Sequence, residues 1–220
     1  MASTIAALTS GAGGISMTGD ASGILNLNSN GTNVVAVTSA GVAVTGTLSA
    51  TGAITGSSTV AGSTGILYPL TSGTAVASTS GTSIDFTSIP SWVKRITVMF
   101  AGVSTAGSGI LIQIGAGSVT TSGYISTGNQ YNQANGTNGI SSTAGFAMFT
   151  SAADIISGIM TISALGSNIW VNSFAGKRTT TECISGGGNV TLGGTLDRVR
   201  FTTVNGTDAF DAGTVNLLYE

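Results

Sequence analysis

The feature that most constrains this chain is its scarcity of charge, which is most extreme in the first third. The 220 residues include 6 Lys and Arg and 8 Asp and Glu, and Asp20 is the only charged side chain before Asp85. Exposed helices need Glu, Lys, Arg and Gln, and disordered chains are rich in charge and proline. Thr, Val and Ile favour strands, and Ser, Asn and the 34 Gly favour turns. The composition therefore predicts an all-β protein.

The charge balance and the missing histidines exclude several function classes. A net charge of −2 argues against nucleic-acid binding, which needs a basic face. With no His and only Cys183, the chain can form no internal disulfide and has few ligands for zinc or other transition metals. No His is present to activate Cys183, so we expect a small buried side chain rather than a nucleophile. We expect no cofactor.

The sequence contains no recognisable targeting or membrane segment. The start, "MASTIAALTSGAGG", lacks a basic stretch followed by a continuous apolar one, so we expect no signal peptide. No run of about 18 apolar residues occurs, which predicts no membrane insertion.

Two regions of different character meet near Tyr68-Pro69. Residues 1–68 form an almost uncharged Gly/Ser/Thr-rich segment, and an uncharged surface is a solubility risk for a free monomer. We therefore expect this arm to contact other copies of the chain or another protein. Residues 69–220 are expected to form an antiparallel β-sandwich, jelly-roll-like, with roughly eight to ten strands.

The arm carries a hairpin pattern in "GILNLNSNGTNVVAVTSAG". Leu alternates with Asn, Asn30-Gly31 supplies a turn, and Val then alternates with Ala and Thr. The following "GVAVTGTLSATGAITGSSTVAG" repeats small apolar pairs between glycines. A flexible linker is the alternative to an ordered, oligomeric segment, but a linker does not need regularly placed apolar residues. The residues expected at a subunit interface are Leu25, Leu27, Val35, Val37, Val42, Val44, Leu48 and Ile54.

The clearest strands of the second region have period-two alternation. In "SWVKRITVMFAGV", Ile96, Val98 and Phe100 are predicted to face the core. "GILIQIGAG" places isoleucines 110, 112 and 114 on one face in the same way. The glycines in this stretch and in "ISGGGNVTLGG" open no helix, which argues against a phosphate-binding loop.

Candidate site residues are few. Asp208 and Asp211, in "NGTDAFDAG", share a predicted loop that could hold calcium, although an Asp in a turn more often bonds its own backbone. Tyr124, Tyr131 and Trp170 are candidates for an exposed surface that stacks on sugar, although a core position is the default expectation for Trp170.

Two stretches carry a resemblance to a known class of protein. "TGDASGILNLNSNGTNVVAVTSAGVAVTGTLSATGAIT" resembles the N-terminal region of tailed-bacteriophage fibre-type proteins. "IDFTSIPSWVKRITVMFAGVS" and "GGTLDRVRFTTVNGTDAFDAGTVNLLYE" resemble the C-terminal β domain of phage fibres and spikes, a domain also used by capsid decoration proteins. The resemblance implies a homotrimeric virion protein made in the host cytoplasm, with no catalytic motif to transfer.

Two functions are compatible with that resemblance. The first is a trimeric decoration, or cement, protein that binds the major capsid protein and stabilises the capsid surface, with a possible role in host adsorption. The second is a short tail or head fibre, attached to a tail component, whose C-terminal domain binds a host surface glycan. A glycan-degrading spike enzyme is the third and least favoured, because such spikes usually need a long β-helix.

Overall fold

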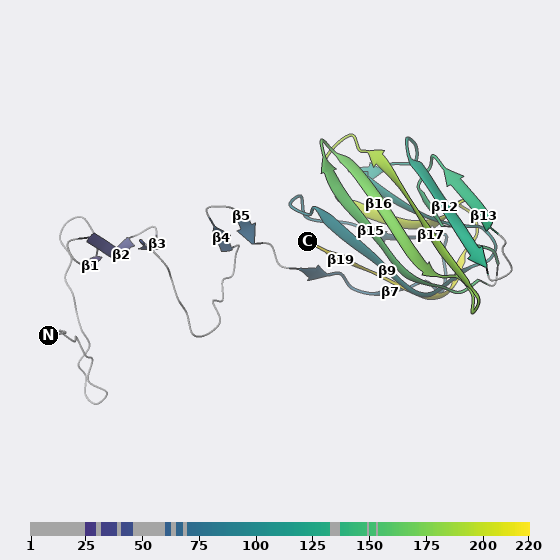
Figure 1. Cartoon of the computed structure of the whole chain (residues 1–220), viewed down its shortest axis with the longest axis horizontal. Helices are drawn as coiled ribbons and strands as arrows, with labels where there is room; N and C mark the ends of the chain where they lie inside the picture. The colour runs from purple at the N-terminus through teal and green to yellow at the C-terminus, as the bar shows by residue number, and fades with distance from the viewer. Residues whose placement is uncertain are drawn as a thin grey trace, which may run out of the picture. The chain divides into compact units, whose positions relative to one another are not determined.

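The computed structural model describes residues 25–29, 32–38, 41–45, 60–62, 65–67, 70–132, 137–148, 150–152 and 154–220. Every regular element in these ranges is a β-strand, and no helix occurs among them (Figure 1). The chain divides into two compact units, Met1–Ser58 and Thr59–Glu220. The all-β prediction is therefore confirmed.

The described strands of the first unit form a three-stranded antiparallel sheet in the order β1–β2–β3. These strands are β1 (Leu25–Ser29), β2 (Thr32–Thr38) and β3 (Gly41–Val44). Leu27 pairs with Val35 across the first hairpin, as the alternation of apolar and polar residues indicates. The predicted hairpin is confirmed, and its Asn30-Gly31 turn lies outside the described residues.

Two short strands pair with each other at the start of the second unit. They are β4 (Val60–Gly62) and β5 (Gly65–Leu67). Residues 59–68, which the sequence places in the arm, thus belong by their contacts to the second unit. The functional division into residues 1–68 and 69–220 stays a prediction.

The rest of the second unit is a β-sandwich, and a nine-stranded antiparallel sheet is its larger layer among the described residues. The sheet runs in the order β13–β12–β17–β16–β15–β9–β19–β6, and β7 pairs with β19 beside this path. Figure 1 shows β12, β13, β15, β16 and β17 side by side across one face. The strands are β6 (Thr71–Ser72), β7 (Val76–Ala77), β9 (Arg95–Thr105), β12 (Ile125–Asn132), β13 (Thr137–Ser142), β15 (Ile156–Gly166), β16 (Ile169–Lys177), β17 (Glu182–Thr191) and β19 (Phe210–Tyr219).

A five-stranded antiparallel sheet of described residues forms the second layer. Its order is β11–β10–β18–β8, and β14 also pairs with β10, along the same edge as β11 and opposite β18. The strands are β8 (Ser83–Phe86), β10 (Ile110–Ala116), β11 (Ser118–Val119), β14 (Phe146–Met148) and β18 (Arg198–Thr203).

The hydrophobic core lies between the two sheets. Ile96, Val98 and Phe100 of β9 are buried, and Thr97 and Met99 between them are only partly buried. The three isoleucines of β10, at positions 110, 112 and 114, are also buried in the same cluster. Both face predictions are confirmed, and the two strands supply facing sides of one core.

Tyr124 anchors β10 from within the core. Its hydroxyl accepts a hydrogen bond from the Ile114 N–H at 2.8 Å and donates one to the Ile114 carbonyl at 3.1 Å. Its ring meets Phe146 edge to face, with centroids 5.0 Å apart. Burial raises the pKa of Tyr124 to about 12, because the phenolate would lose its hydration.

The described part of the second unit contains more strands than the eight to ten expected from residue 69 onward, since β6 to β19 are fourteen. β12 was missed because its inward residues are Ser126, Gly128 and Gln130, which reverses the usual apolar-in pattern. The first part of β17 was missed because the glycines at positions 186–188 read as a loop. At Gly186 a side chain would lie 2.4 Å from the Thr127 carbonyl oxygen, so only glycine lets β12 and β17 approach.

Candidate functional site

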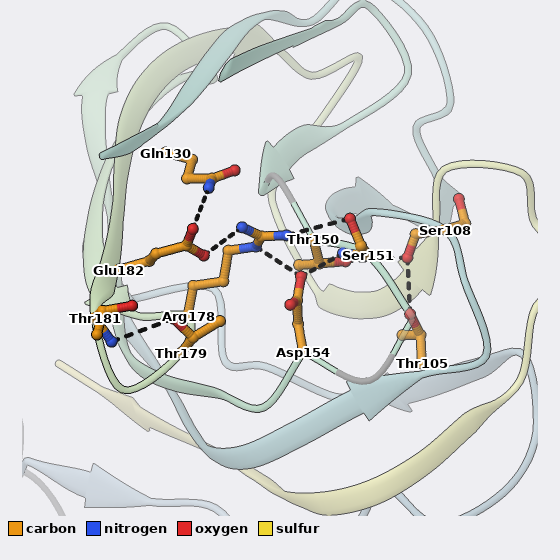
Figure 2. Close-up of polar contacts among 10 residues, drawn as sticks. All are labelled: Thr105, Ser108, Gln130, Thr150, Ser151, Asp154, Arg178, Thr179, Thr181 and Glu182. Atoms are coloured by element: carbon orange, nitrogen blue, oxygen red, sulfur yellow. Dashed lines mark hydrogen bonds and ion pairs between the residues drawn. The ribbon is translucent and has the colours of Figure 1, made fainter. Parts of the chain in front are cut away.

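A buried ion cluster joins the β16–β17 hairpin to the loop that precedes β15 (Figure 2). Arg178 donates from Nε to Asp154 Oδ2 at 2.6 Å and from Nη1 to Glu182 Oε2 at 2.5 Å. Only 10% of the Arg178 side chain and 9% of the Asp154 side chain are exposed. One cation thus holds two carboxylates largely out of water, where an unpaired charge would be costly.

Further hydrogen bonds fix this cluster to its surroundings. Gln130 of β12 donates from Nε2 to Glu182 Oε1 at 2.8 Å, so both oxygens of that carboxylate are engaged. The Ser151 N–H donates to Asp154, and Arg178 Nη2 donates to Ser151 Oγ at 3.2 Å. The hairpin loop is therefore held both against β12 and against the loop before β15.

The hairpin loop itself is closed by backbone contacts. The Arg178 N–H donates to the Glu182 carbonyl at 3.0 Å, and the Thr181 N–H donates to Thr179 Oγ1 at 3.3 Å. A threonine hydroxyl that bonds backbone two residues away is a local turn contact. The loop thus presents a run of threonines, 179–181, at the end of the hairpin.

A surface groove of about 520 Å³ lies at this end of the nine-stranded sheet and shares Glu182 with the ion cluster. Cys183 pairs with Tyr131 of β12 on one side and with Lys177 of β16 on the other. These three residues form one cross-strand row, and all three are exposed. The groove is lined by Tyr131, Asn132, Lys177, Thr179, Thr180, Thr181, Glu182 and Cys183.

The groove offers an aromatic ring, hydroxyls and a positive charge within one row. Tyr131 is 44% exposed and can stack on an apolar ring face while its hydroxyl stays in water. Lys177 forms no ion pair with any described residue, whereas each of the four arginines is paired with a carboxylate. This arrangement can bind a ligand that combines an apolar face, hydroxyl groups and negative charge.

Two sequence-based expectations about this region were wrong, a surface position for Tyr124 and a buried one for Cys183, whereas the core position preferred for Trp170 is confirmed. Tyr124 and Trp170 are 1% and 5% exposed, so neither can lie on a ligand-binding surface. The reason is that both side chains point between the sheets, where each fills a place in the core. Cys183 was expected to be buried and is exposed, because its position in β17 turns it to the outer face. Of the aromatic candidates, Tyr131 alone lies on the groove.

The two calcium candidates are separated by the start of a strand. Asp208 accepts from the Ser108 N–H at 2.6 Å, while Asn205 Oδ1 accepts from the backbone of the same turn at Thr207 and Asp208. Asp211 belongs to β19 and not to the loop, which corrects the expected grouping. No group of three or more His, Cys, Asp or Glu side chains capable of holding a metal occurs among the described residues.

The arginines of β18 form surface ion pairs. Arg200 lies opposite Asp85 of β8, and its Nε donates to Asp85 Oδ1 at 2.6 Å. Arg198 pairs with the neighbouring Asp197 at 2.8 Å, and this hydrogen bond from Arg198 holds the pKa of the Asp197 carboxyl below its usual value. The guanidinium groups of Arg198 and Arg200 are therefore already paired with carboxylates and are less available to a charged ligand.

The interface candidates of the first unit share one face of its sheet. Val35 pairs with Leu27 and with Val44, so these three form a cross-strand row. Val42 lies two residues from Val44 and therefore on the same face. Leu27, Val42 and Val44 are 48%, 64% and 37% exposed within the single chain. The backbones of Leu25 and Val37 fall in the row of Val42, whereas Leu48 and Ile54 lie outside the described residues.

Sequence reasoning missed the groove and the cluster beneath it. The available signal was "KRTTTEC", in which Arg178 and Glu182 flank a threonine run at a spacing that a tight hairpin brings together. The pairing with Asp154 carried no such signal, because Asp154 lies 24 residues earlier in the chain.

No protein-family model, curated protein or solved structure matches this chain. Within the ranges that the structure describes, no helix has the length and apolar character needed to cross a membrane.

Proposed function

We propose that this chain is a non-enzymatic structural protein of a phage virion, a homotrimer that decorates and stabilises the capsid surface. The first unit would hold the copies together and attach them to the shell. The observation that carries this proposal is the exposed apolar face of the β1–β3 sheet, formed by Leu27, Val35, Val42 and Val44. The resemblance of residues 18–55, 84–104 and 193–220 to phage fibre-type and decoration proteins supports the class of particle.

The apolar face favours burial against another protein surface. A small sheet becomes stable when an apolar face is covered, and fully burying a Val or Leu side chain contributes about 1.5–3 kcal/mol. The first 84 residues contain only Asp20 as a charged side chain, so little charge would have to be desolvated when the sheet docks. Other copies of the same sheet and an uncharged capsid surface both suit these requirements.

The placement of the carboxylates supports a structural rather than catalytic role. The side chains of Asp85, Asp154, Glu182, Asp197 and Glu220 are each ion-paired with an arginine. A general acid and base must instead be held where they can reach a substrate proton. These acids stabilise strand ends and loops.

A short tail or head fibre with a glycan-binding domain is the second candidate, and the groove beside Tyr131 favours it. Copy number separates the two functions. Quantitative mass spectrometry of purified virions should find a copy number comparable to that of the capsid subunits if the chain is a decoration protein. Fewer than about one trimer for every dozen capsid subunits would contradict decoration and favour a fibre.

A pair of variants tests whether the apolar face makes the attachment. Val42→Asp places a charge on the apolar face, and Ala43→Asp places the same charge on the opposite face of the same strand. Added to virions that lack the protein, Val42→Asp should fail to decorate them, while Ala43→Asp should bind to wild-type occupancy. Equal occupancy of the two variants would contradict attachment through this face.

A further inference from the structure

We infer that the groove at the end of β12, β16 and β17 is a binding site for a sugar residue that carries a carboxylate. The inference concerns the second unit alone, and it does not depend on whether the first unit attaches the protein to a capsid. It assigns a ligand class to residues of the second unit, none of which belongs to β1, β2 or β3.

The spacing of the strands gives the groove a width suited to one ring. Tyr131 and Lys177 flank Cys183 in a cross-strand row, so about 10 Å separates their backbones at the usual strand spacing. The two long side chains stand on either side of a much smaller one. The row therefore has an aromatic wall, a cationic wall and a low floor at the Cys183 thiol.

The polar groups along the groove match a polyol with one negative charge. Lys177 offers up to three N–H donors to an anionic oxygen. Thr179, Thr180 and Thr181 add hydroxyls that can both donate and accept, as a sugar's hydroxyls require. Tyr131 supplies the apolar surface on which the C–H face of a pyranose can stack.

The ion cluster preorganises these groups. Arg178 is buried beneath the hairpin loop and holds Glu182 and Asp154, so the loop does not have to be ordered when a ligand binds. Both oxygens of Glu182 are already hydrogen-bonded, to Arg178 and to Gln130. The charge left unpaired in the groove is that of Lys177, which is why an acidic sugar fits better than a neutral one.

A peptide is a poorer occupant of the same groove. Extended peptides usually bind by adding a strand to an open sheet edge. Here β17 lies between β12 and β16, and its backbone is paired on both sides at Cys183. The groove therefore recognises a ligand through side chains, as a sugar site does.

Cys183 allows a direct test, because it is the only cysteine in the chain and it forms part of the groove lining. The rate of its alkylation by iodoacetamide is measured on the full-length protein with a hyaluronan tetrasaccharide, with neutral cellotetraose and with tetraglutamate. We expect a saturating concentration of the hyaluronan fragment to slow alkylation about tenfold. Tetraglutamate and cellotetraose should require at least about tenfold higher concentrations for the same protection.

Variants locate the effect. Tyr131→Ala and Lys177→Gln should each weaken protection by the hyaluronan fragment about tenfold, the loss expected for a stacking contact or a charged hydrogen bond. Lys94→Gln is the matched control, because Lys94 is the other lysine without an ion pair among the described residues and it lines a different pocket. Thermal unfolding should be unchanged in all three variants, because each side chain is exposed.

Three outcomes would overturn the inference. The first is no protection by the hyaluronan fragment at millimolar concentration, and the second is equal protection by tetraglutamate or cellotetraose. The third is an equal loss of protection in Lys94→Gln and Lys177→Gln, which would show a general attraction of anions to the protein.

Discussion

Replacing Arg178 with methionine should cost far more stability than the same substitution at Arg200. Both arginines donate from Nε to an aspartate at 2.6 Å, Arg178 to Asp154 and Arg200 to Asp85. The two pairs differ in burial, since the exposed fractions of the side chains are 10% and 9% in the first and 35% and 37% in the second. The two arginines also differ in partners, because Arg178 pairs with Glu182 as well, whereas Arg200 donates from both Nε and Nη2 to Asp85 alone.

The expected magnitudes follow from what each substitution leaves behind. Arg178→Met leaves the carboxylates of Asp154 and Glu182 in the interior without a cation, and breaking a buried pair in this way costs about 3–5 kcal/mol. Arg200→Met exposes Asp85 to water, and a pair of that kind contributes about 0–1 kcal/mol. Against a total stability of about 5–15 kcal/mol, the first change is severe and the second is minor.

Urea denaturation of the two variants, followed by circular dichroism, measures these costs. A triple variant, Arg178→Met with Asp154→Asn and Glu182→Gln, serves as the internal control, because it removes the stranded charges. We expect the triple variant to recover part of the stability lost in Arg178→Met. Equal costs for Arg178→Met and Arg200→Met would refute the assignment of a buried cluster.

Three further predictions test the interior of the sandwich, the first of them with a matched control. Gly186→Ala should cost about 1–3 kcal/mol in urea denaturation, since the new Cβ would lie 2.4 Å from the Thr127 carbonyl oxygen, whereas Gly193→Ala meets open space and should be neutral. The pKa of Tyr124 is about 12 in the folded chain and about 10 in the unfolded chain. The stability that the neutral phenol contributes is therefore complete below pH 10, and the free energy of unfolding falls by about 3 kcal/mol as the pH rises to 12. Thermal melts should show that Tyr124→Phe lacks this alkaline loss, and an identical alkaline slope in both proteins would contradict the raised pKa. Asn172→Leu should raise the melting temperature, because neither the nitrogen nor the oxygen of the buried Asn172 amide has a hydrogen-bond partner in the described structure. Removing such an unsatisfied group contributes about 1–3 kcal/mol of stability. A lower melting temperature would show that the amide is hydrogen-bonded.

The strands that could be predicted are those whose side chains alternate. In β9 the residues Ile96, Val98 and Phe100 face inward because their period matches the pleat of a strand. The hairpin of β1 and β2 was readable for the same reason, with Leu27 and Val35 meeting across it. Local pattern was sufficient in these elements because one face of each strand is apolar.

The strands that could not be predicted depend on their partners. β12 turns Ser126 and Gln130 inward, where Ser126 Oγ accepts from the Ala147 N–H and Gln130 Nε2 donates to the Glu182 carboxylate, both distant in sequence. The glycines of β17 lie in a strand because the backbones of the neighbouring strands approach them too closely for a side chain. The local sequence of β17 contains no sign of this approach. Tertiary context decides both cases.

The candidate site could be predicted even less well than the fold. Tyr131 was recognised as a possible surface aromatic, but its neighbours Lys177 and Cys183 are 46 and 52 residues away and meet it only through strand pairing. Tyr124 and Trp170 could not be distinguished from it, because an isolated aromatic residue gives no sign of which face it occupies. The register in which β12, β16 and β17 pair brings these residues together, and that register cannot be read from the sequence.

The mass of the full-length protein in solution tests the proposed assembly most directly. Light scattering at micromolar concentration should give three times the chain mass of 21.5 kDa, because association of the copies would cover the apolar face of β1–β3 that is exposed in the single chain. The Val42→Asp variant should then give the mass of one chain, and Ala43→Asp should remain a trimer. A mass of one chain for the unmodified protein would contradict the proposed assembly.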